Sequence, residues 1–248
     1  MQVYRELRIL TSRPSTTDEI DIPHRLYGCV SGASHYSVGH WLDAVSFEIN
    51  DVWNSGQLPI IVGGTGLYFM ALEKGLAKIP SIDPVIRDKW RKFQGDLHHQ
   101  LATRHPESAN HLDPADRQRL VRALEVYDGT GLPLIHWQKI AQEQSLLFGV
   151  NVERKYLNVS RSELYYRADQ RFNLMMEQGA LEEVRIFPKL DTQMPIMKAI
   201  GVPQLQAYYN GQLTLDEAVA AGKLATRHYI KRQTTWSRGQ MKDWPVAH

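Results

Sequence analysis

A glycine-rich turn with one hydroxyl group, Gly63-Gly-Thr-Gly66, is the first feature of the sequence that could take part in chemistry. Glycines let the backbone turn sharply and approach a ligand closely, because no Cβ intervenes. The apolar segment Leu58–Val62 precedes the turn and predicts a buried strand, whereas Leu67–Leu72 has helical character. Open α/β sheets place phosphorylated ligands at such junctions, where Thr65 would add its hydroxyl. The spacing matches neither the dinucleotide fingerprint nor the phosphate-loop motif, so a tight connection without a ligand is the alternative.

Basic side chains cluster near the start of a predicted helix that runs through residues 117–127 and whose apolar side is Leu120, Ala123, Leu124 and Tyr127. Arg119 and Arg122 lie three residues apart and share a face, while Arg117 is offset. Gln118 adds an amide that could contact a base edge or a ribose. Guanidinium groups beside an amide suit RNA, because phosphate contacts supply affinity and unstacked bases supply specificity. The alternative is a solvated face paired with the acidic neighbours Asp113, Asp116 and Glu125.

A second basic stripe lies near the carboxyl end, where Lys223, Arg227 and Lys231 recur at four-residue intervals and Arg232 follows. This stripe could hold a phosphate backbone or a diphosphate, or it could be the charged outer face of a terminal helix. Arg185 is a further candidate for an anion contact, with an ordinary surface salt bridge as its alternative.

The composition is that of an ordinary globular protein, with 43% hydrophobic and 23% charged residues among 248. The net charge of +2 does not by itself indicate nucleic-acid binding, so the local clusters must carry that inference. Cys29 is the single cysteine, which excludes internal disulfides and cysteine-based zinc sites, and the ten histidines show no metal-ligand spacing. We therefore assign no metal to side chains of the chain. Without a membrane-length apolar run or a signal-peptide core, we expect a cytoplasmic protein with no membrane contact.

The pattern of polar and charged residues divides the chain. Residues 80–137 are helical, polar and charged, and they predict a helical insertion subdomain. Residues 1–79 and 138–248 form the predicted α/β core, with Tyr156–Val159 as a returning strand. Ser37 and Ser160 are the predicted caps of two helices in this core.

Several motifs, in the same order along the chain, resemble those of the bacterial tRNA dimethylallyltransferases. The resemblance covers Met1 to about Trp244 and rests on Met1-Gln-Val-Tyr-Arg5, Pro59–Phe69, Gln118–Tyr127, Thr130–Leu134, Lys198–Gly201 and Lys231–Trp236. It implies an α/β fold similar to phosphate-loop kinases, a nucleotide-binding type of fold in which helices flank a parallel sheet and a helical subdomain is inserted. It also implies transfer of a dimethylallyl group, with Mg²⁺, from dimethylallyl diphosphate to the N6 amine of adenine 37, next to the anticodon, in tRNAs that read codons starting with U. The implied partners are the tRNA anticodon stem-loop and the diphosphate donor, and we expect a monomer.

The resemblance also implies roles for individual residues. Thr65 would lie in the reaction channel near the target base, as a catalytic and tRNA-binding residue. Arg185 would be catalytic and would hold the diphosphate together with Arg227. The remaining expected tRNA contacts are Met1, Gln2, Arg87, Gln118, Arg119, Leu120, Val121, Arg122, Lys231 and Arg232. Thr65 could orient the amine or the ribose but could not act as the general base.

The chain departs from the family pattern in one respect, because no Gly-x-x-x-x-Gly-Lys-Ser/Thr motif occurs in it. Met1 coincides with an internal methionine of the family, so the phosphate loop, the first strand and the general-base aspartate would lie upstream. We therefore expect an amino-terminally truncated, impaired form in which Ile60 and Val62 are exposed beside a missing strand. The alternatives are a non-catalytic tRNA-binding remnant and a small-molecule kinase of similar fold. Leu10 stands where the family usually has glycine, which questions the turn around it.

Overall fold

The computed structural model describes residues 1–143, 145–185, 187 and 193–247, and the chain divides into two compact units. The first unit comprises Met1–Gly66 and Glu153–His248, and the second comprises Leu67–Val152. The predicted insertion, residues 80–137, lies inside the second unit.

The helices of the first unit begin where side chains cap their free N–H groups. Ser37 caps α2, Ser160 caps α9, and Thr214 forms a capping box with Glu217 at the start of α12. The caps at Ser37 and Ser160 confirm the predicted helix starts. In chain order the helices of this unit are α1 (Thr16–Asp21), α2 (Val38–Asn54), α9 (Arg161–Glu177), α10 (Ala180–Arg185), the short 3₁₀ helix η1 (Pro195–Lys198), α11 (Val202–Tyr209) and α12 (Leu215–Gln240).

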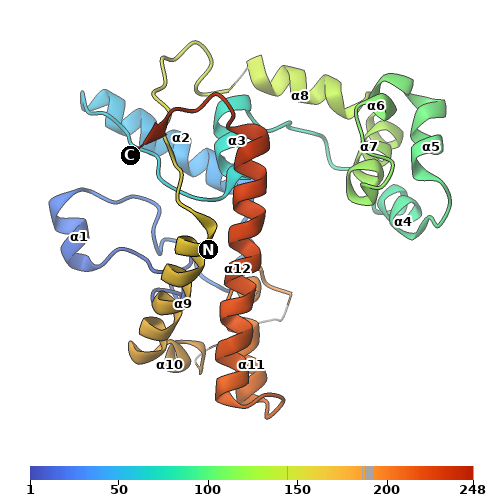
Figure 1. The fold of residues 1–248 in the computed structure, drawn as a ribbon. Coiled ribbons are helices and arrows are strands. Elements are labelled where there is room, and N and C mark those ends of the chain that lie inside the picture. Colours follow the sequence, from blue (N-terminus) through green and yellow to red (C-terminus); the bar gives the residue numbers. More distant parts are fainter. Residues whose placement is uncertain (144, 186, 188–192, 248) are drawn as a thin grey trace. The chain divides into compact units, whose positions relative to one another are not determined.

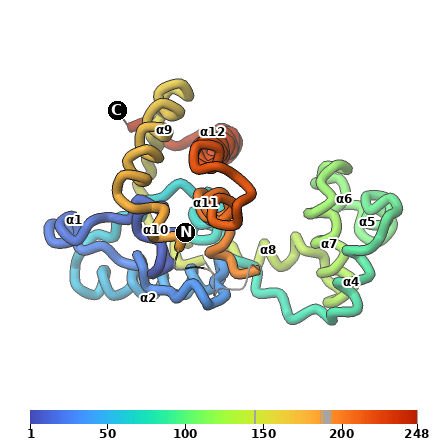
Figure 2. The backbone as a smooth tube through the Cα atoms, turned by 90° about the horizontal axis from the view of Figure 1, so that it is seen from below, coloured from blue at the N-terminus to red at the C-terminus, as the bar shows by residue number. Residues whose placement is uncertain are grey.

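The long helix α12 organises the first unit, since both α9 and α11 pack along it (Figures 1 and 2). Gly222 of α12 is buried against the ring of Phe172 in α9, and a side chain at this glycine would collide with that ring. The fully buried side chains around these helices include Leu7, Val184, Phe187, Ile196, Val202 and Leu205. This core supports the helix that faces the glycine-rich turn.

One carboxylate ties the amino-terminal segment to α10. Glu183 accepts hydrogen bonds from the backbone N–H groups of Arg8 at 2.6 Å, Ile9 at 2.7 Å and Leu10 at 2.9 Å. Leu10 itself is buried, with 8% of its surface exposed. The turn around Leu10 is thus held by a side chain from another element, and leucine is accommodated there.

The sheet is much smaller than the sequence predicts. Within the described residues it consists of β1 (Tyr156–Leu157) paired in parallel with β2 (Val246–Ala247), with Tyr156 opposite Val246 and Leu157 opposite Ala247. An isolated parallel bridge joins Tyr4 to Val30. The predicted parallel pairing and the predicted strand at Tyr156 are confirmed. The prediction of an extended, helix-flanked sheet is wrong, because the described part of the chain is dominated by helices.

The predicted strand Leu58–Val62 is also wrong. The segment carries no regular secondary structure, and Leu58, Ile60 and Val62 are 81%, 77% and 77% exposed. A strand exists only through hydrogen bonds to a neighbour. Within the described part of the chain, no backbone–backbone hydrogen bond reaches residues 58–62. The predicted exposure of Ile60 and Val62 is confirmed.

The second unit is a cluster of helices (Figure 1). Trp90, Leu97, Leu101, Leu120 and Leu124 form its core. The predicted apolar side of the helix through residues 117–127 is buried there, as expected. The helices are α3 (Gly66–Lys74), which begins at the last residue of the first unit, and then α4 (Pro84–Lys92), α5 (Leu97–Arg104), α6 (Pro106–Asn110), α7 (Arg117–Thr130) and α8 (Leu134–Glu143). In the described part of the chain, none of the helices has the length and apolar character to cross a membrane.

Candidate functional site

The glycine-rich turn of the first unit lies against α12. The hydroxyl oxygens of Thr65 and Tyr229 are 3.1 Å apart, within hydrogen-bond distance. The side-chain amide of Gln233 donates to the carbonyl oxygen of Gly64 at 2.8 Å. Two polar side chains of one helix therefore hold two successive residues of the turn.

The glycines of this turn are required by the closeness of α12. A Cβ at Gly64 would collide with the amide of Gln233, and a Cβ at Gly66 would collide with the ring of Trp236. From the sequence, the backbone of this turn was predicted to approach a ligand closely. In the structure, the element that lies close to this backbone is helix α12. The turn is thus a packed connection that presents one hydroxyl.

A cleft of about 540 Å³ opens on α12 next to this contact. Lys231 and Arg232, both predicted from the sequence, line the cleft. The guanidinium carbon of Arg232 also lies 5.5 Å from the ring centre of Tyr229, a distance suited to a cation–π contact. The residues lining the cleft are His228, Lys231, Arg232, Thr235 and Trp236. Its two cations and the indole of Trp236 suit an anion attached to an apolar or aromatic group.

A separate cleft, again of about 540 Å³, lies on the second unit. Its lining residues are Arg91, Arg117, Gln118, Val121, Arg122 and Glu125. The predicted residues Gln118, Val121 and Arg122 are brought together here, whereas Arg119 is not part of the lining. Arg91 and Glu125 were missed as site residues. Helical spacing is the sequence signal that could have identified them, because residues three or four apart share a helix face. Arg91 is four residues after Arg87 on α4, and Glu125 is three residues after Arg122 on α7.

The carboxylate of Glu125 organises this cleft. Its side chain is 4% exposed, and it accepts a hydrogen bond from Nε of Arg91 at 3.0 Å and lies 3.5 Å from Nη1 of Arg122. The side chains of Arg91 and Arg122 are 60% and 40% exposed. Because two guanidinium groups share one carboxylate, positive charge remains in excess, and their other N–H groups are available for an anion.

Arg117 has a different task. Its Nη2 donates to the carbonyl oxygens of Arg91 at 3.1 Å and Phe93 at 2.6 Å, at the end of α4. These carbonyls have no partner within their own helix, so Arg117 satisfies them and fastens α4 to α7. Its charge adds to the field of the cleft while its hydrogen bonds are structural.

The remaining residues predicted on α4 and α7 differ in their surroundings. Arg119 is 74% exposed and forms an ion pair with Asp116, which also caps α7. Leu120 is 1% exposed and belongs to the core, and its predicted contact with tRNA stays a prediction. Arg87 is half-buried, and its Nε has no hydrogen-bond partner within the described residues.

Three further predicted residues lie in the first unit. The amide of Gln2 donates to the carbonyls of Thr11 at 3.1 Å and Ser12 at 3.2 Å, so it supports a turn, and the side chain of Met1 is exposed. Arg185 is 69% exposed and pairs with Glu182 at 3.2 Å. Their contacts with tRNA or diphosphate stay predictions.

Arg227 forms a two-pronged ion pair with Asp169 of α9. Its Nε donates to one carboxylate oxygen at 3.1 Å, and its Nη2 donates to the other. The hydrogen bond from Arg227 to Asp169 and the charge of Asp169 raise the pKa of Arg227 above its ordinary value. A diphosphate at Arg227 would have to share this guanidinium with a carboxylate, and the predicted contact stays a prediction.

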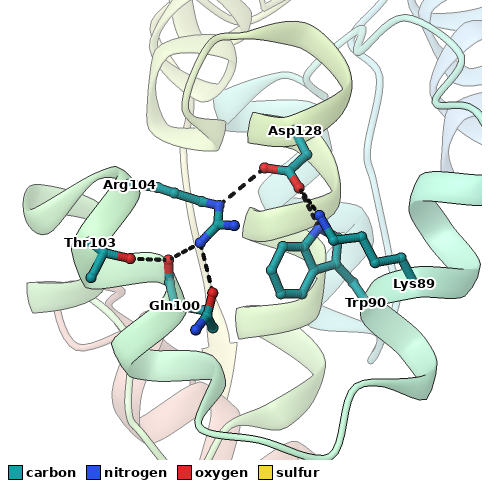
Figure 3. A network of polar contacts seen from close by, with 6 residues as sticks. All are labelled: Lys89, Trp90, Gln100, Thr103, Arg104 and Asp128. Atoms are coloured by element: carbon teal, nitrogen blue, oxygen red, sulfur yellow. Dashed lines mark hydrogen bonds and ion pairs between the residues drawn. The ribbon is translucent and has the colours of Figure 1, made fainter.

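A polar network supports the helices that carry the second cleft (Figure 3). Asp128 of α7 accepts hydrogen bonds from Nζ of Lys89 and Nε1 of Trp90, both at 2.9 Å, and from Nε of Arg104 at 3.2 Å. Arg104 also donates to the carbonyl oxygen of Gln100 at 2.8 Å. One carboxylate thereby connects α4, α5 and α7.

Influences of opposite sign act on the pKa of Asp128. Burial raises it and is the largest single influence, while hydrogen bonds from Lys89 and Trp90 and the charges of Lys89 and Arg104 lower it. The lowering influences prevail together, so the pKa of Asp128 lies below its ordinary value. The carboxylate is therefore charged wherever the unit is folded near neutral pH.

The described residues contain no cluster of three or more histidine, cysteine, aspartate or glutamate side chains that could hold a metal ion. The expectation of Mg²⁺ therefore stands on the resemblance alone.

Basic clefts and a hydroxyl-bearing glycine turn define a protein equipped to bind anionic ligands. The chain belongs to the IPP transferase family, whose family model matches residues 2–240. It is 47% identical to the tRNA dimethylallyltransferase of Azorhizobium caulinodans, over 98% of this chain and 80% of that protein. It is also 47% identical to the tRNA dimethylallyltransferase of Methylobacterium nodulans, over 98% of this chain and 83% of that protein. The family expected from the sequence motifs is thereby confirmed.

Solved structures support the same assignment. The full-length tRNA isopentenylpyrophosphate transferase of Bacillus halodurans is 29% identical, with a TM-score of 0.69 over 99% of this chain and 78% of that one. A eukaryotic dimethylallyltransferase acting on tRNA has a TM-score of 0.78 over 96% of this chain and 61% of that one. That second protein is 24% identical and is evidence for the fold alone.

Proposed function

We propose that this chain transfers a dimethylallyl group from dimethylallyl diphosphate to the N6 amine of adenine 37 in tRNAs that read codons starting with U. The observation that carries the proposal is the 47% identity to a tRNA dimethylallyltransferase over 98% of this chain. The two basic clefts support it, because both substrates are anionic. The proposal includes a monomeric protein acting in the cytoplasm.

The cleft on the second unit supports binding of the RNA backbone. Arg91 and Arg122 offer guanidinium groups held by Glu125, and Gln118 offers an amide beside them. A phosphate oxygen accepts strong, charge-assisted hydrogen bonds from such groups. The target adenine is stacked in the anticodon loop, so it must leave the stack before its amine can react.

The turn and the cleft on α12 support the chemistry. In the transfer, the bond between N6 and the first carbon of the dimethylallyl group forms as the bond from that carbon to the diphosphate oxygen breaks. The leaving diphosphate gains negative charge, which Lys231 and Arg232 can stabilise, and Arg185 and Arg227 are proposed further contacts. The amine loses a proton in the reaction, which the released diphosphate or solvent water can accept. Thr65 can orient the amine or the ribose, but its hydroxyl is too weak a base to take that proton.

Magnesium enters the proposal only through the family resemblance. The described residues provide no group of acidic or histidine ligands for it, so we assign it no protein ligand and no step. Mg²⁺ requires oxygen ligands, and diphosphate oxygens are of that kind.

Prenyl transfer to an anticodon stem-loop tests the proposal. With dimethylallyl diphosphate present, we expect a stem-loop bearing adenine 37 to gain the mass of one dimethylallyl group. The matched control replaces adenine 37 with guanine and should gain none. Stem-loop binding without any transfer would favour the tRNA-binding remnant, and the absence of both binding and transfer would contradict the proposal.

A further inference from the structure

Helix α12 meets the glycine-rich turn with three residues of one stripe. Tyr229, Gln233 and Trp236 are spaced by four and three residues, so their side chains project from the same side of the helix. Gln233 contacts Gly64, Tyr229 contacts Thr65, and Trp236 lies where a side chain at Gly66 would be. Three consecutive residues of the turn thus each have their own partner on α12.

We propose that Tyr229, Gln233 and Trp236 are positioning residues that fix the Thr65 hydroxyl for prenyl transfer, an inference that rests on the proposed function. None of the three is among the site residues predicted from the sequence. They act through Thr65 and the turn backbone. Helix α12 thus both lines the basic cleft and positions the glycine-rich turn.

The turn needs such support because the segment that precedes it, residues 58–62, provides none. Residues 58–62 carry no regular secondary structure and expose Leu58, Ile60 and Val62. A glycine-rich segment has more backbone freedom than any other, so fixing it costs the most conformational entropy. A threonine hydroxyl can moreover occupy several rotamers. The hydrogen bond with Tyr229 selects among them, and the amide of Gln233 anchors the residue before.

The same stripe connects the turn to the basic cleft. Trp236 lines the cleft and also packs against Gly66, and Arg232 lies over the ring of Tyr229. A rigid helix carries all of these side chains. The position of the Thr65 hydroxyl is therefore fixed relative to Lys231 and Arg232, which are the cations proposed for the diphosphate.

The test removes single groups from the stripe. Tyr229→Phe deletes only the hydroxyl that contacts Thr65, and we expect kcat for stem-loop prenylation to fall about 3- to 10-fold, the effect of one hydrogen bond. The KM for the stem-loop should not change. Tyr166→Phe is the matched control, since Tyr166 is 63% exposed on α9, and it should leave kcat unchanged.

A double-mutant cycle separates positioning from general damage. Thr65→Val removes the hydroxyl that Tyr229 would orient, so Tyr229→Phe should have no further effect on kcat in that background. The same fold-loss in both backgrounds would overturn the inference. So would a Tyr229→Phe protein whose kcat matches that of the Tyr166→Phe control, or one in which only KM changes.

Backbone order parameters provide a readout that does not depend on turnover. Gln233→Ala removes the anchor of the Gly64 carbonyl, and we expect the order parameters of residues 63–66, measured by ¹⁵N relaxation, to fall from about 0.85 to below about 0.6. Unchanged order parameters there would overturn the inference whatever the activity. Lower order parameters in a protein whose unsubstituted form shows no transfer would support the positioning of the turn and contradict the proposed function instead.

Discussion

At the scale of single residues, buried or half-buried carboxylates hold this protein together by accepting several donors at once. Glu183 accepts three backbone N–H groups, and Glu125 lies against two guanidinium groups. A carboxylate is well suited to this because its two oxygens offer about four lone pairs. Such a residue connects chain segments that lie far apart in the sequence.

Glu183→Ala tests this role in the first unit. The substitution leaves the N–H groups of residues 8–10 without their acceptor, so we expect the free energy of unfolding to fall by about 3 kcal/mol. Urea unfolding followed by circular dichroism measures the change. Glu182→Ala is the matched control, because Glu182 is an exposed neighbour paired with Arg185, and it should cost less than about 1 kcal/mol. Equal losses in the two variants would contradict the assigned role of Glu183.

Arg91→Ala tests the cleft on the second unit. Each phosphate contact contributes about 0.7–0.9 to the slope of log affinity against log salt, so the variant should bind the stem-loop more weakly and with a slope smaller by about one contact. Titrations at several salt concentrations measure the slope. Lys92→Ala is the control, since Lys92 is 78% exposed, pairs with Asp88 and does not line the cleft. An unchanged slope in Arg91→Ala would remove Arg91 from the RNA site.

At the scale of elements, the sequence predicted well where local chemistry decides the structure. The caps at Ser37 and Ser160 and the apolar side of α7 are local signals, and all three are confirmed. The segment Leu58–Val62 has equally clear strand character, yet it is irregular, because a strand depends on a partner that local sequence does not specify. Arg91 was missed for a similar reason, since only the packing of α4 on α7 brings it to Glu125.

The packing of α4 and α5 on α7 depends on the charge of Asp128, which predicts a pH dependence. The folded-state pKa of Asp128 is depressed. Its stabilisation is therefore complete above the unfolded-state pKa of about 4 and is lost as the pH falls through the folded-state pKa. We expect Asp128→Asn to lose about 1.5–3 kcal/mol of stability at neutral pH and to approach the unsubstituted protein in acid.

Urea unfolding at a series of pH values measures this difference. Asp88→Asn is the control: the pKa of Asp88 is likewise lowered, by the hydrogen bond and charge of Lys92, but its side chain is 63% exposed. Its substitution should therefore change stability far less than Asp128→Asn does, at any pH. A cost of Asp128→Asn that is the same at every pH would show that geometry, and not charge, holds the network.

At the scale of the whole molecule, function and solubility depend on where charge and apolar surface lie and not on their totals. The net charge is only +2, yet three arginines line the cleft on the second unit, and Lys231 and Arg232 line the cleft on α12. The exposed apolar side chains Leu58, Ile60 and Val62 alternate along a segment whose backbone, within the described residues, is not paired with another strand. Such a segment can add a strand from a second molecule.

We therefore expect the chain to self-associate through residues 58–62 at high concentration. Replacing Ile60 and Val62 together by threonine keeps the β-branched shape and removes apolar surface, so it should lower the apparent mass measured by light scattering. Val85→Thr is the matched control, because Val85 is 74% exposed but lies in the first turn of α4, where its N–H donates to the side chain of Asp83. If Val85→Thr lowers the association as much as the double substitution, exposed apolar area alone causes it, and the unpaired backbone of residues 58–62 has no special part.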